Sequence, residues 1–215
     1  MIEQEYKLRV TQPEQYEAVA GAPEVRDLAE GAGRTLHMIA DYIDTAELSL
    51  LRAGYAYRVR KEGEQWVAAI KADMGNAAEG GLHHHREWEA EVDTPEPDLG
   101  VFGDPDLIEA LLALQGDRPL VTLFRVDMER RVLDLRFDGD NRAEWAADRG
   151  RIIAGDKVEP LCEVELELKG GSMEPVRKLA ETLRARYPLA PDQRTKFARG
   201  LALAGLEGNS GHEGS

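Results

Sequence analysis

Hydrophobic and charged residues alternate with a period of two along most of this chain. Over residues 2–10, charged side chains occupy the odd positions and mostly apolar ones the even positions. Such alternation predicts a β-strand that buries one face. The pattern recurs, and we expect further strands at residues 55–61, 66–71, 85–92, 123–137, 142–148 and 162–169.

Other segments show helical spacing of apolar residues, and we expect helices at 13–20, 104–114, 174–187 and 193–204. Thr11 precedes the first of these as an expected N-cap, with Glu14 three positions on. The second opens with Asp-Pro, and the third carries Pro175 in its first turn. Strands with helices inserted at their ends predict one antiparallel sheet system.

The composition fits a single soluble domain. The chain has 215 residues, of which 42% are hydrophobic and 32% charged, enough for an ordinary core. The sequence shows neither an apolar run of membrane-spanning length nor a secretory signal, so we expect a cytoplasmic protein. We expect residues 1–206 to form the domain and the Gly- and Ser-rich residues 207–215 to form a disordered tail.

The net charge of the chain limits the kinds of molecule that the protein is expected to bind. Lys and Arg number 27 against 41 Asp and Glu, a formal net charge of −14. This field opposes general binding of nucleic acid or anionic membrane. The single cysteine, Cys162, excludes an intrachain disulfide framework and a multi-cysteine zinc site.

The charged alternates are segregated along the chain. Residues 3–7 read Glu-x-Glu-x-Lys and residues 163–169 carry three alternating glutamates, whereas Arg58, Arg60 and Lys71 lie on strands between them. Alternate strand side chains project the same way, about 6.5–7 Å apart, so such glutamates repel one another unless a cation lies among them. Carboxylates suit Mg²⁺ or Mn²⁺, and Arg and Lys suit phosphate oxygens. Composition alone favours a solvated sheet face, whereas closure of the sheet would turn these charges inward.

The order of motifs resembles the CYTH superfamily, or triphosphate tunnel metalloenzymes, and within it the bacterial inorganic triphosphatases. The resemblance runs from Ile2 to about Leu203. The motifs that carry it are, in chain order, Glu3-x-Glu5-x-Lys7, Tyr42-Ile43-Asp44-Thr45 with Leu51-Arg52, Arg58-Val59-Arg60, Trp66 to Lys71, Gly80-Gly81-Leu82-His83 leading into Glu87-Trp88-Glu89, Asp148-Arg149-Gly150, residues 162–168, and Lys196 with Arg199-Gly200.

The resemblance implies an α+β fold, a closed eight-stranded antiparallel β-barrel (the triphosphate tunnel) with peripheral helices. It implies hydrolysis of inorganic triphosphate to diphosphate and phosphate, with Mg²⁺ or Mn²⁺ as cofactor. The implied catalytic residues are Glu3, Glu5, Lys7, Lys71 and Lys196. The implied phosphate ligands are Lys7, Arg58, Arg60, Lys71, His85, Arg125, Arg130, Lys196 and Arg199. The implied metal ligands are Glu3, Glu5, Glu87, Asp148, Glu163, Glu165 and Glu167.

The chain departs from the family pattern in places. Two residues before Glu87 the family tends to have arginine, and here the residue is His85. Either His85 substitutes for that arginine, or a bulge presents Arg86. The register near Arg130 is also ambiguous, and Arg131 could replace it.

Alternative functions stay open: a thiamine-triphosphatase, a nucleoside-triphosphatase, a class IV adenylate cyclase, or a non-catalytic polyphosphate-binding module. The two acidic strands favour an enzyme, because a simple binder gains little from glutamates placed beside phosphates. We expect a small-molecule triphosphate as the partner, no nucleic acid or membrane, and a monomer or homodimer.

Overall fold

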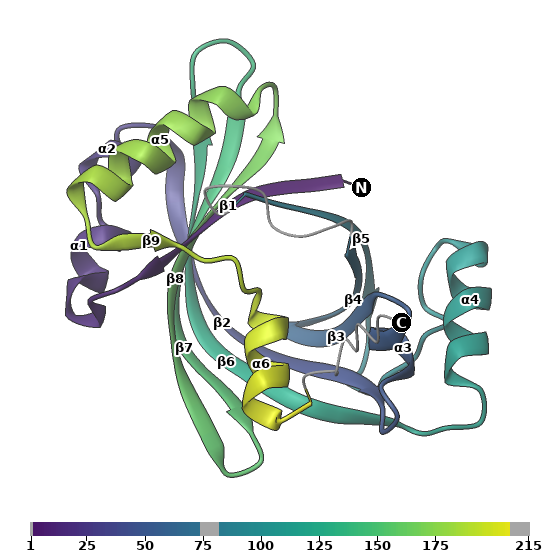
Figure 1. Cartoon of the computed structure of the whole chain (residues 1–215). Coiled ribbons are helices and arrows are strands. Elements are labelled where there is room, and N and C mark those ends of the chain that lie inside the picture. The colour runs from purple at the N-terminus through teal and green to yellow at the C-terminus, as the bar shows by residue number, and fades with distance from the viewer. Residues whose placement is uncertain (1, 74–81, 207–215) are drawn as a thin grey trace, which may run out of the picture.

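The central feature of the computed structural model, which describes residues 2–73 and 82–206, is a ring of antiparallel strands (Figure 1). Eight strands follow one another in the order β5-β4-β3-β2-β6-β7-β8-β1, and β1 pairs back with β5 to close the ring. Their bounds are β1 Ile2–Val10, β2 Ala29–Thr45, β3 Tyr55–Glu62, β4 Gln65–Asp73, β5 Leu82–Val92, β6 Leu120–Arg136, β7 Arg142–Ala154 and β8 Lys157–Gly170. A short strand, β9 (Leu189–Pro191), pairs with the far end of β1.

All seven strands predicted from alternation are confirmed, but β2 was not predicted. Its first half contains Gly31 and Gly33 and is largely exposed, and its second half buries residues on both faces. Burial does alternate from His37 to Tyr42, but Ile39 is apolar on the face opposite Met38 and Ala40, so the sequence does not show this alternation. The prediction also ended β7 early and began β8 late, because both strands continue into their shared hairpin.

The helices lie between or after the strands. They are η1 Pro13–Gln15, α1 Tyr16–Ala20, α2 Pro23–Arg26, α3 Ser49–Arg52, α4 Pro105–Gln115, α5 Met173–Arg186 and α6 Lys196–Ala204. The predicted N-cap Thr11 is wrong, because its hydroxyl donates to the carbonyl of Pro188 at 2.9 Å instead. Asp104 caps α4 and Thr195 caps α6 through side-chain acceptors. No helix in the described ranges has the length and apolar character needed to cross a membrane.

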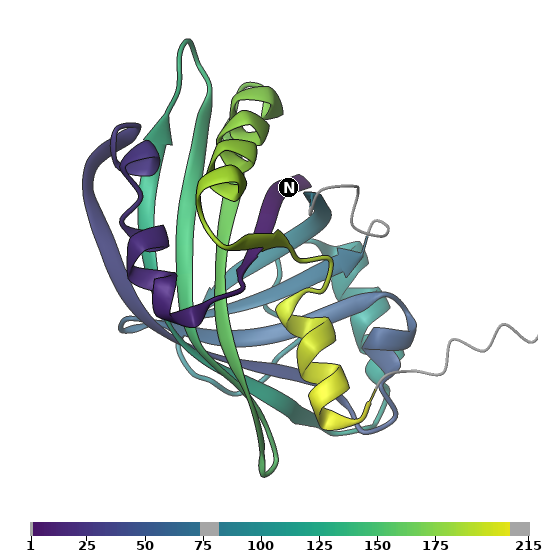
Figure 2. The same ribbon diagram turned by 60° about the vertical axis from the view of Figure 1, so that its left-hand side comes forward.

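Apolar packing holds the ring from outside and from within. Outside, α1, α2 and α5 cover β1, β7 and β8, and α3 and α4 cover β3, β4 and β5 (Figures 1 and 2). Inside, α6 packs against apolar side chains that β2 and β6 direct into the ring, among them Tyr42 and Phe124. The part of the ring interior that α6 does not fill is lined by the charged side chains of the strands.

The close approach of α6 to the ring depends on Gly200. A Cβ atom at this position would collide with the ring of Phe124, which itself stacks on Tyr42. We expect Gly200→Ala to lower the free energy of unfolding by about 1–3 kcal/mol, the usual cost of overpacking a core. Urea unfolding measures the change. Gly103→Ala is the matched control, because no heavy atom lies within 4 Å of its added Cβ; an equal loss in both variants would contradict the packing argument.

Candidate active site inside the tunnel

A cavity of about 950 Å³ lies inside the ring, lined by the inward side chains of the strands and by α6. The charged alternates therefore face the interior and are not a solvated outer face. Among the described residues, the basic lining consists of Lys7, Arg34, Arg58, Arg60, Lys71, Arg130, Lys169 and Lys196. The acidic lining consists of Glu3, Glu5, Glu62, Glu87, Glu89, Glu144, Glu165 and Glu167. Eight basic side chains thus meet eight acidic ones, and His85 adds an imidazole to the same lining.

One wall combines arginine from β3 with lysine from β4. Arg58 Nη2 donates to Glu87 Oε1 at 3.1 Å, and Lys71 Nζ lies 2.5 Å from Glu3 Oε2 and 3.3 Å from Glu87 Oε2. Burial opposes the charge of Arg58, but Tyr42 and Glu87 outweigh it and raise the pKa of the guanidinium. Within the described chain, Arg58 Nε is buried and has no hydrogen-bond partner. This wall therefore holds a donor that is ready for an anionic ligand.

The opposite wall holds a buried acidic cluster, Asp148, Glu163 and Glu165. One oxygen from each lies within 4.8 Å of the others, a grouping that could hold a metal ion. Lys196 Nζ contacts all three carboxylates, at 2.8, 2.5 and 2.8 Å respectively. Lys7 Nζ lies 3.5 Å from Glu163 and 3.1 Å from Glu165.

Arg130 completes the neutralisation of this cluster. Its Nε and Nη2 donate to the two oxygens of Asp148 at 2.7 Å each, and Nη2 also reaches Glu165 at 2.5 Å. Burial alone would raise the pKa of Asp148, but Arg130 and Lys196 outweigh it and hold that pKa below its usual value. The same carboxylates overcome burial and raise the pKa of Lys196. The cluster is therefore an ionised network of paired charges.

A second acidic set, Glu3, Glu5 and Glu167, is less well compensated. Glu5 and Glu167 face each other across the β1–β8 ladder, and Glu5 is only 6% exposed. In the described part of the chain Glu5 forms no ion pair. Burial, opposed by Lys169 and reinforced by Glu3, raises the pKa of Glu167 to about 7. Glu3 pairs with Lys71 at 2.5 Å and Glu167 pairs with Lys169 at 2.7 Å. Carboxylate oxygens of this kind are the ligands that Mg²⁺ or Mn²⁺ prefers.

The raised pKa of Glu167 gives a pH-dependent prediction. The folded protein holds this proton up to about pH 7, whereas the unfolded chain releases it near 4.5, so the site loses stability as pH rises through that window. In EDTA at about pH 8, Glu167→Gln should raise the free energy of unfolding by about 1–2 kcal/mol, and by a few tenths at about pH 5. Urea titrations at both pH values measure this, with Glu144→Gln as the control from the same cavity. A pH-independent effect of Glu167→Gln would contradict it.

Two arginines expected at the phosphates lie elsewhere. Arg125 is on the outer face of β6, where its Nε and Nη2 donate to Asp41 at 2.7 and 2.8 Å, so its predicted place in the tunnel is wrong. Arg199 is buried, but it lies behind the cavity wall and not along it. There it donates to Glu159 at 2.8 Å and to Glu163 at 3.2 Å. The structure brings the other predicted phosphate ligands to the cavity, namely Lys7, Arg58, Arg60, Lys71, His85, Arg130 and Lys196.

The predicted metal ligands divide between the lining and the wall behind it. Glu3, Glu5, Glu87, Glu165 and Glu167 line the cavity. Asp148 and Glu163 have fully buried side chains and reach it through Lys196 and Lys7.

Both ambiguous registers are resolved by where the side chains point. His85 lines the cavity, and burial together with Lys71 lowers its pKa. Arg86 lies outside, with its guanidinium carbon 4.2 Å from the ring centre of Trp88. Arg130 points inward, whereas Arg131 donates to Glu17 on the outer surface at 2.7 Å. Neither strand therefore needs a bulge at these positions.

Several lining residues were not predicted from the sequence. Arg34 lies on β2, the strand whose existence the alternation did not reveal. Glu62 continues the inward period of Arg60, so extending the alternation by one step would have found it. Lys169 ends the charged alternation of residues 163–169 but was not named as a site residue, and Glu144 lies on a predicted strand that carries no motif at that position.

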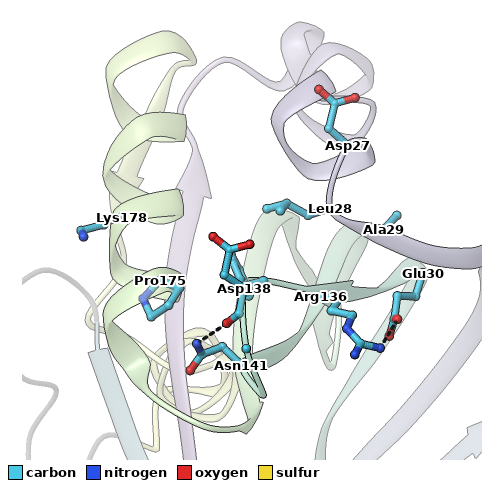
Figure 3. A pocket seen from close by; sticks show the side chains of 11 residues that line it. Asp27, Leu28, Ala29, Glu30, Arg136, Asp138, Asn141, Pro175 and Lys178 are labelled. Atoms are coloured by element: carbon cyan, nitrogen blue, oxygen red, sulfur yellow. Dashed lines mark hydrogen bonds and ion pairs between the residues drawn. The ribbon is translucent and has the colours of Figure 1, made fainter.

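A second cavity of about 750 Å³ lies outside the ring, between α5 and the β6–β7 hairpin (Figure 3). Its charged residues are already engaged or apart: Arg136 pairs with Glu30 at 3.0 Å, and Lys178 points away from the others. Asn141 donates to the carbonyl of Asp138 at 2.7 Å. No predicted site residue lines this cavity, so the tunnel is the candidate active site.

The family follows from a sequence comparison. Residues 1–201 match the CYTH domain. The chain belongs to the CYTH family. The inorganic triphosphatase of Haemophilus influenzae is 26% identical to this CYTH chain over 167 residues, which is 75% of the chain. The alignment covers 44% of that relative, so the CYTH chain spans less than half of its length.

Solved structures show the same fold. A Hippeastrum protein, described as an adenylyl cyclase candidate with a dominant triphosphatase activity, has a TM-score of 0.62 at 20% identity, covering 93% of this CYTH chain and 95% of its own. An adenylate cyclase candidate from Bacillus halodurans has a TM-score of 0.54 at 14% identity, covering 92% and 97%. At these identities the likeness concerns the fold, and it confirms the predicted CYTH tunnel.

Proposed function

We propose that this protein hydrolyses inorganic triphosphate to diphosphate and phosphate inside the tunnel, with Mg²⁺ or Mn²⁺ as cofactor. The observation that carries the proposal is the meeting of a basic wall and an acidic set in one cavity, where Arg58 Nε has no hydrogen-bond partner among the described residues. Membership of the CYTH family and the triphosphatase relative support the same chemistry.

The balanced charge of the lining explains why the ligand would be a metal–triphosphate complex. Eight basic and eight acidic side chains give the described lining no net attraction for a bare polyanion. A divalent cation bound by Glu3, Glu5 and Glu167 would leave the basic residues in excess. When bound, that metal would polarise phosphate oxygens and lower the pKa of a bound water.

The basic residues would then bind and orient the triphosphate. Arg58 and Arg60 are suited to bidentate grip on phosphate oxygens, and Lys71 adds a point charge beside them. These side chains would hold the triphosphate in line for attack by water and stabilise the charge that develops on the departing diphosphate. A triphosphate gives up phosphate to water in this way without a covalent enzyme intermediate.

A phosphate-release panel tests the proposal. Inorganic triphosphate, ATP, thiamine triphosphate and diphosphate are each incubated with Mg²⁺, Mn²⁺ or EDTA. We expect release from triphosphate with either metal, at least about tenfold faster than from the other compounds, and none in EDTA. Metal-independent release, or no release from triphosphate under any condition, would contradict the proposal.

A second candidate, hydrolysis of a triphosphate ester, is favoured by the apolar part of the lining. Phe197 of α6 stacks on Tyr42 with ring centres 5.7 Å apart, and both line the cavity together with Leu51. An aromatic group attached to the triphosphate could pack against them. Faster release from ATP or thiamine triphosphate than from inorganic triphosphate would favour this candidate.

A further inference from the structure

The segment that leads into α6 is fixed to the ring through its own backbone. We call residues 189–195 the strap; it consists of β9 and the linker that precedes α6 (Figure 1). β9 pairs with β1 from Leu8 to Val10. Just beyond β9, the Asp192 N–H donates to the carbonyl of Lys7 at 3.1 Å. The strap therefore follows β1 as far as Asp192.

His83 of β5 bonds to the same residue of the strap from the neighbouring strand. Its Nε2 lies 2.9 Å from the carbonyl oxygen of Asp192. Because a carbonyl can only accept, the imidazole must donate through an Nε2–H. His83 is 2% exposed and Asp192 is 6% exposed, so this bond is shielded from water. The N–H and C=O of Asp192 thus bond to β1 and β5, the two strands whose pairing closes the ring.

The imidazole of His83 also contacts the tunnel lining. It stacks on His85 with ring centres 5.7 Å apart, and His85 lines the cavity. Both side chains lie on the inward face of β5, since the residues are two apart on one strand. His83 therefore lies between the strap and the lining of the tunnel.

Asp192 is the last point at which the strap bonds to the ring. Within the described chain, residues 193–195 form no hydrogen bond to a strand of the ring. The Arg194 N–H donates back to Asp192 Oδ1 at 3.1 Å, and Thr195 caps α6. Lys196 is the first residue of α6, and its ammonium contacts the carboxylates of the β7–β8 wall. The position of Asp192 therefore sets where the helix that carries Lys196 begins.

The carboxylate of Asp192 does not hold the strap to the ring. Its Oδ2 is buried and has no hydrogen-bond partner among the described residues. A buried carboxylate oxygen that lacks a partner costs free energy. The attachment therefore depends on the backbone bonds of Asp192, and His83 is the side chain that supplies one of them.

We propose that His83 is a positioning residue of the active site: its Nε2–H fastens the strap to β5 and so holds the start of α6, with Lys196 and Phe197, at the tunnel. The role depends on a hydrogen-bond donor with the reach of the imidazole. The effect on hydrolysis rests on the proposed function, whereas the attachment of the strap does not.

Nuclear magnetic resonance of the ¹⁵N-labelled wild-type chain tests the bond without any substrate. Couplings between the ring protons and the ring nitrogens identify which nitrogen carries a proton. We expect a proton on Nε2 of His83 that exchanges slowly with water, because it is buried and bonded. An Nε2 without a proton would overturn the proposal.

Amide exchange in three variants tests the attachment of the strap. His83→Leu removes the donor, whereas His83→Gln places an amide N–H near the position of Nε2. His37→Leu is the matched control, because His37 also bonds through Nε2, to Asp127 at 2.7 Å, but on the exposed outer face. We expect the Asp192 amide to exchange at least about tenfold faster in His83→Leu, and within about threefold of the wild type in the other two.

Hydrolysis supplies a further readout. With triphosphate and saturating Mg²⁺ or Mn²⁺, we expect His83→Leu to lower kcat/KM at least about fivefold, because Lys196 and Phe197 are then less precisely placed. His83→Gln should restore most of the rate, and His37→Leu should leave it within about twofold.

Unchanged exchange of the Asp192 amide in His83→Leu would overturn the proposal, as would a His83→Gln chain that behaves like His83→Leu. Faster exchange with an unchanged kcat/KM would refute the positioning role. If His83→Leu does not fold, His83→Asn takes its place, since its shorter amide does not reach the carbonyl. A wild type that releases no phosphate would refute the proposed triphosphatase, while the ring proton and the amide exchange still decide whether His83 holds the strap.

Discussion

Replacing Glu3 and Glu5 together by glutamine is expected to lower triphosphate hydrolysis by about a thousandfold or more while the chain stays folded. The two carboxylates line the cavity from β1, and Glu5 has no ion-pair partner in the described structure. Their loss removes the charge that would bind the metal, whose polarisation of the phosphate is worth several kcal/mol. The fold should survive, because the substitution also relieves repulsion between neighbouring glutamates.

The measurement is kcat/KM for triphosphate at saturating Mg²⁺ or Mn²⁺, with circular dichroism to verify folding. Glu14→Gln with Glu47→Gln makes the same change in net charge at exposed positions, and it should leave the rate within about twofold. Unaltered hydrolysis in the Glu3 and Glu5 double variant would show that β1 does not carry the metal ligands.

The second large effect is expected from substitutions of Arg58 and Arg60, the arginines of the basic wall. Arg58→Ala and Arg60→Ala together should weaken the binding and turnover of triphosphate by about 2–4 kcal/mol, the scale for losing buried charge-assisted contacts. Arg58 should account for the larger share, because its Nε is buried and unpartnered in the described chain, whereas Arg60 is already bonded to Glu62 and Glu89.

Isothermal titration of triphosphate and steady-state kinetics measure the two parts of this loss. Arg125→Ala is the control, since Arg125 pairs with Asp41 outside the ring and should leave both quantities unchanged. If Arg58→Ala and Arg60→Ala both keep full triphosphate affinity, or if Arg125→Ala loses as much, then Arg58 and Arg60 do not bind the substrate.

The contrast between Arg125 and Arg130 shows which parts of the site the sequence can predict. Along β6 the register to β7 is continuous from Arg125 to Arg136, so residues of odd and even number face opposite ways. Arg130 and Arg125 therefore could not both line the tunnel, and parity alone would have excluded one of them once the strand was known to be regular.

Other features depended on tertiary structure that no local pattern encodes. The residues of β2 become a strand through pairing on both sides, with β3 and with β6. Arg199 follows Lys196 by one helical turn, and only the depth at which α6 docks decides that one reaches the cavity while the other stays behind Glu163. The resemblance to a family predicted that Lys196 and Arg199 both belong to the site. The packing of α6 places Lys196 at the cavity and Arg199 behind its wall.

Closure of the ring by β1 has a consequence for how the protein folds. The strand that carries Glu3, Glu5 and Lys7 is synthesised before its partners on β8, and six other strands of the ring lie between the two in the chain. Contacts between such distant segments form slowly, because chain entropy must be lost before they stabilise anything. The edge of β1 that faces β8 therefore stays unpaired until β8 has been synthesised, although the other edge can already pair with β5. Substitutions that loosen the β1–β8 pairing should consequently slow refolding more than those in the β3–β4 hairpin, whose partners are neighbours in sequence.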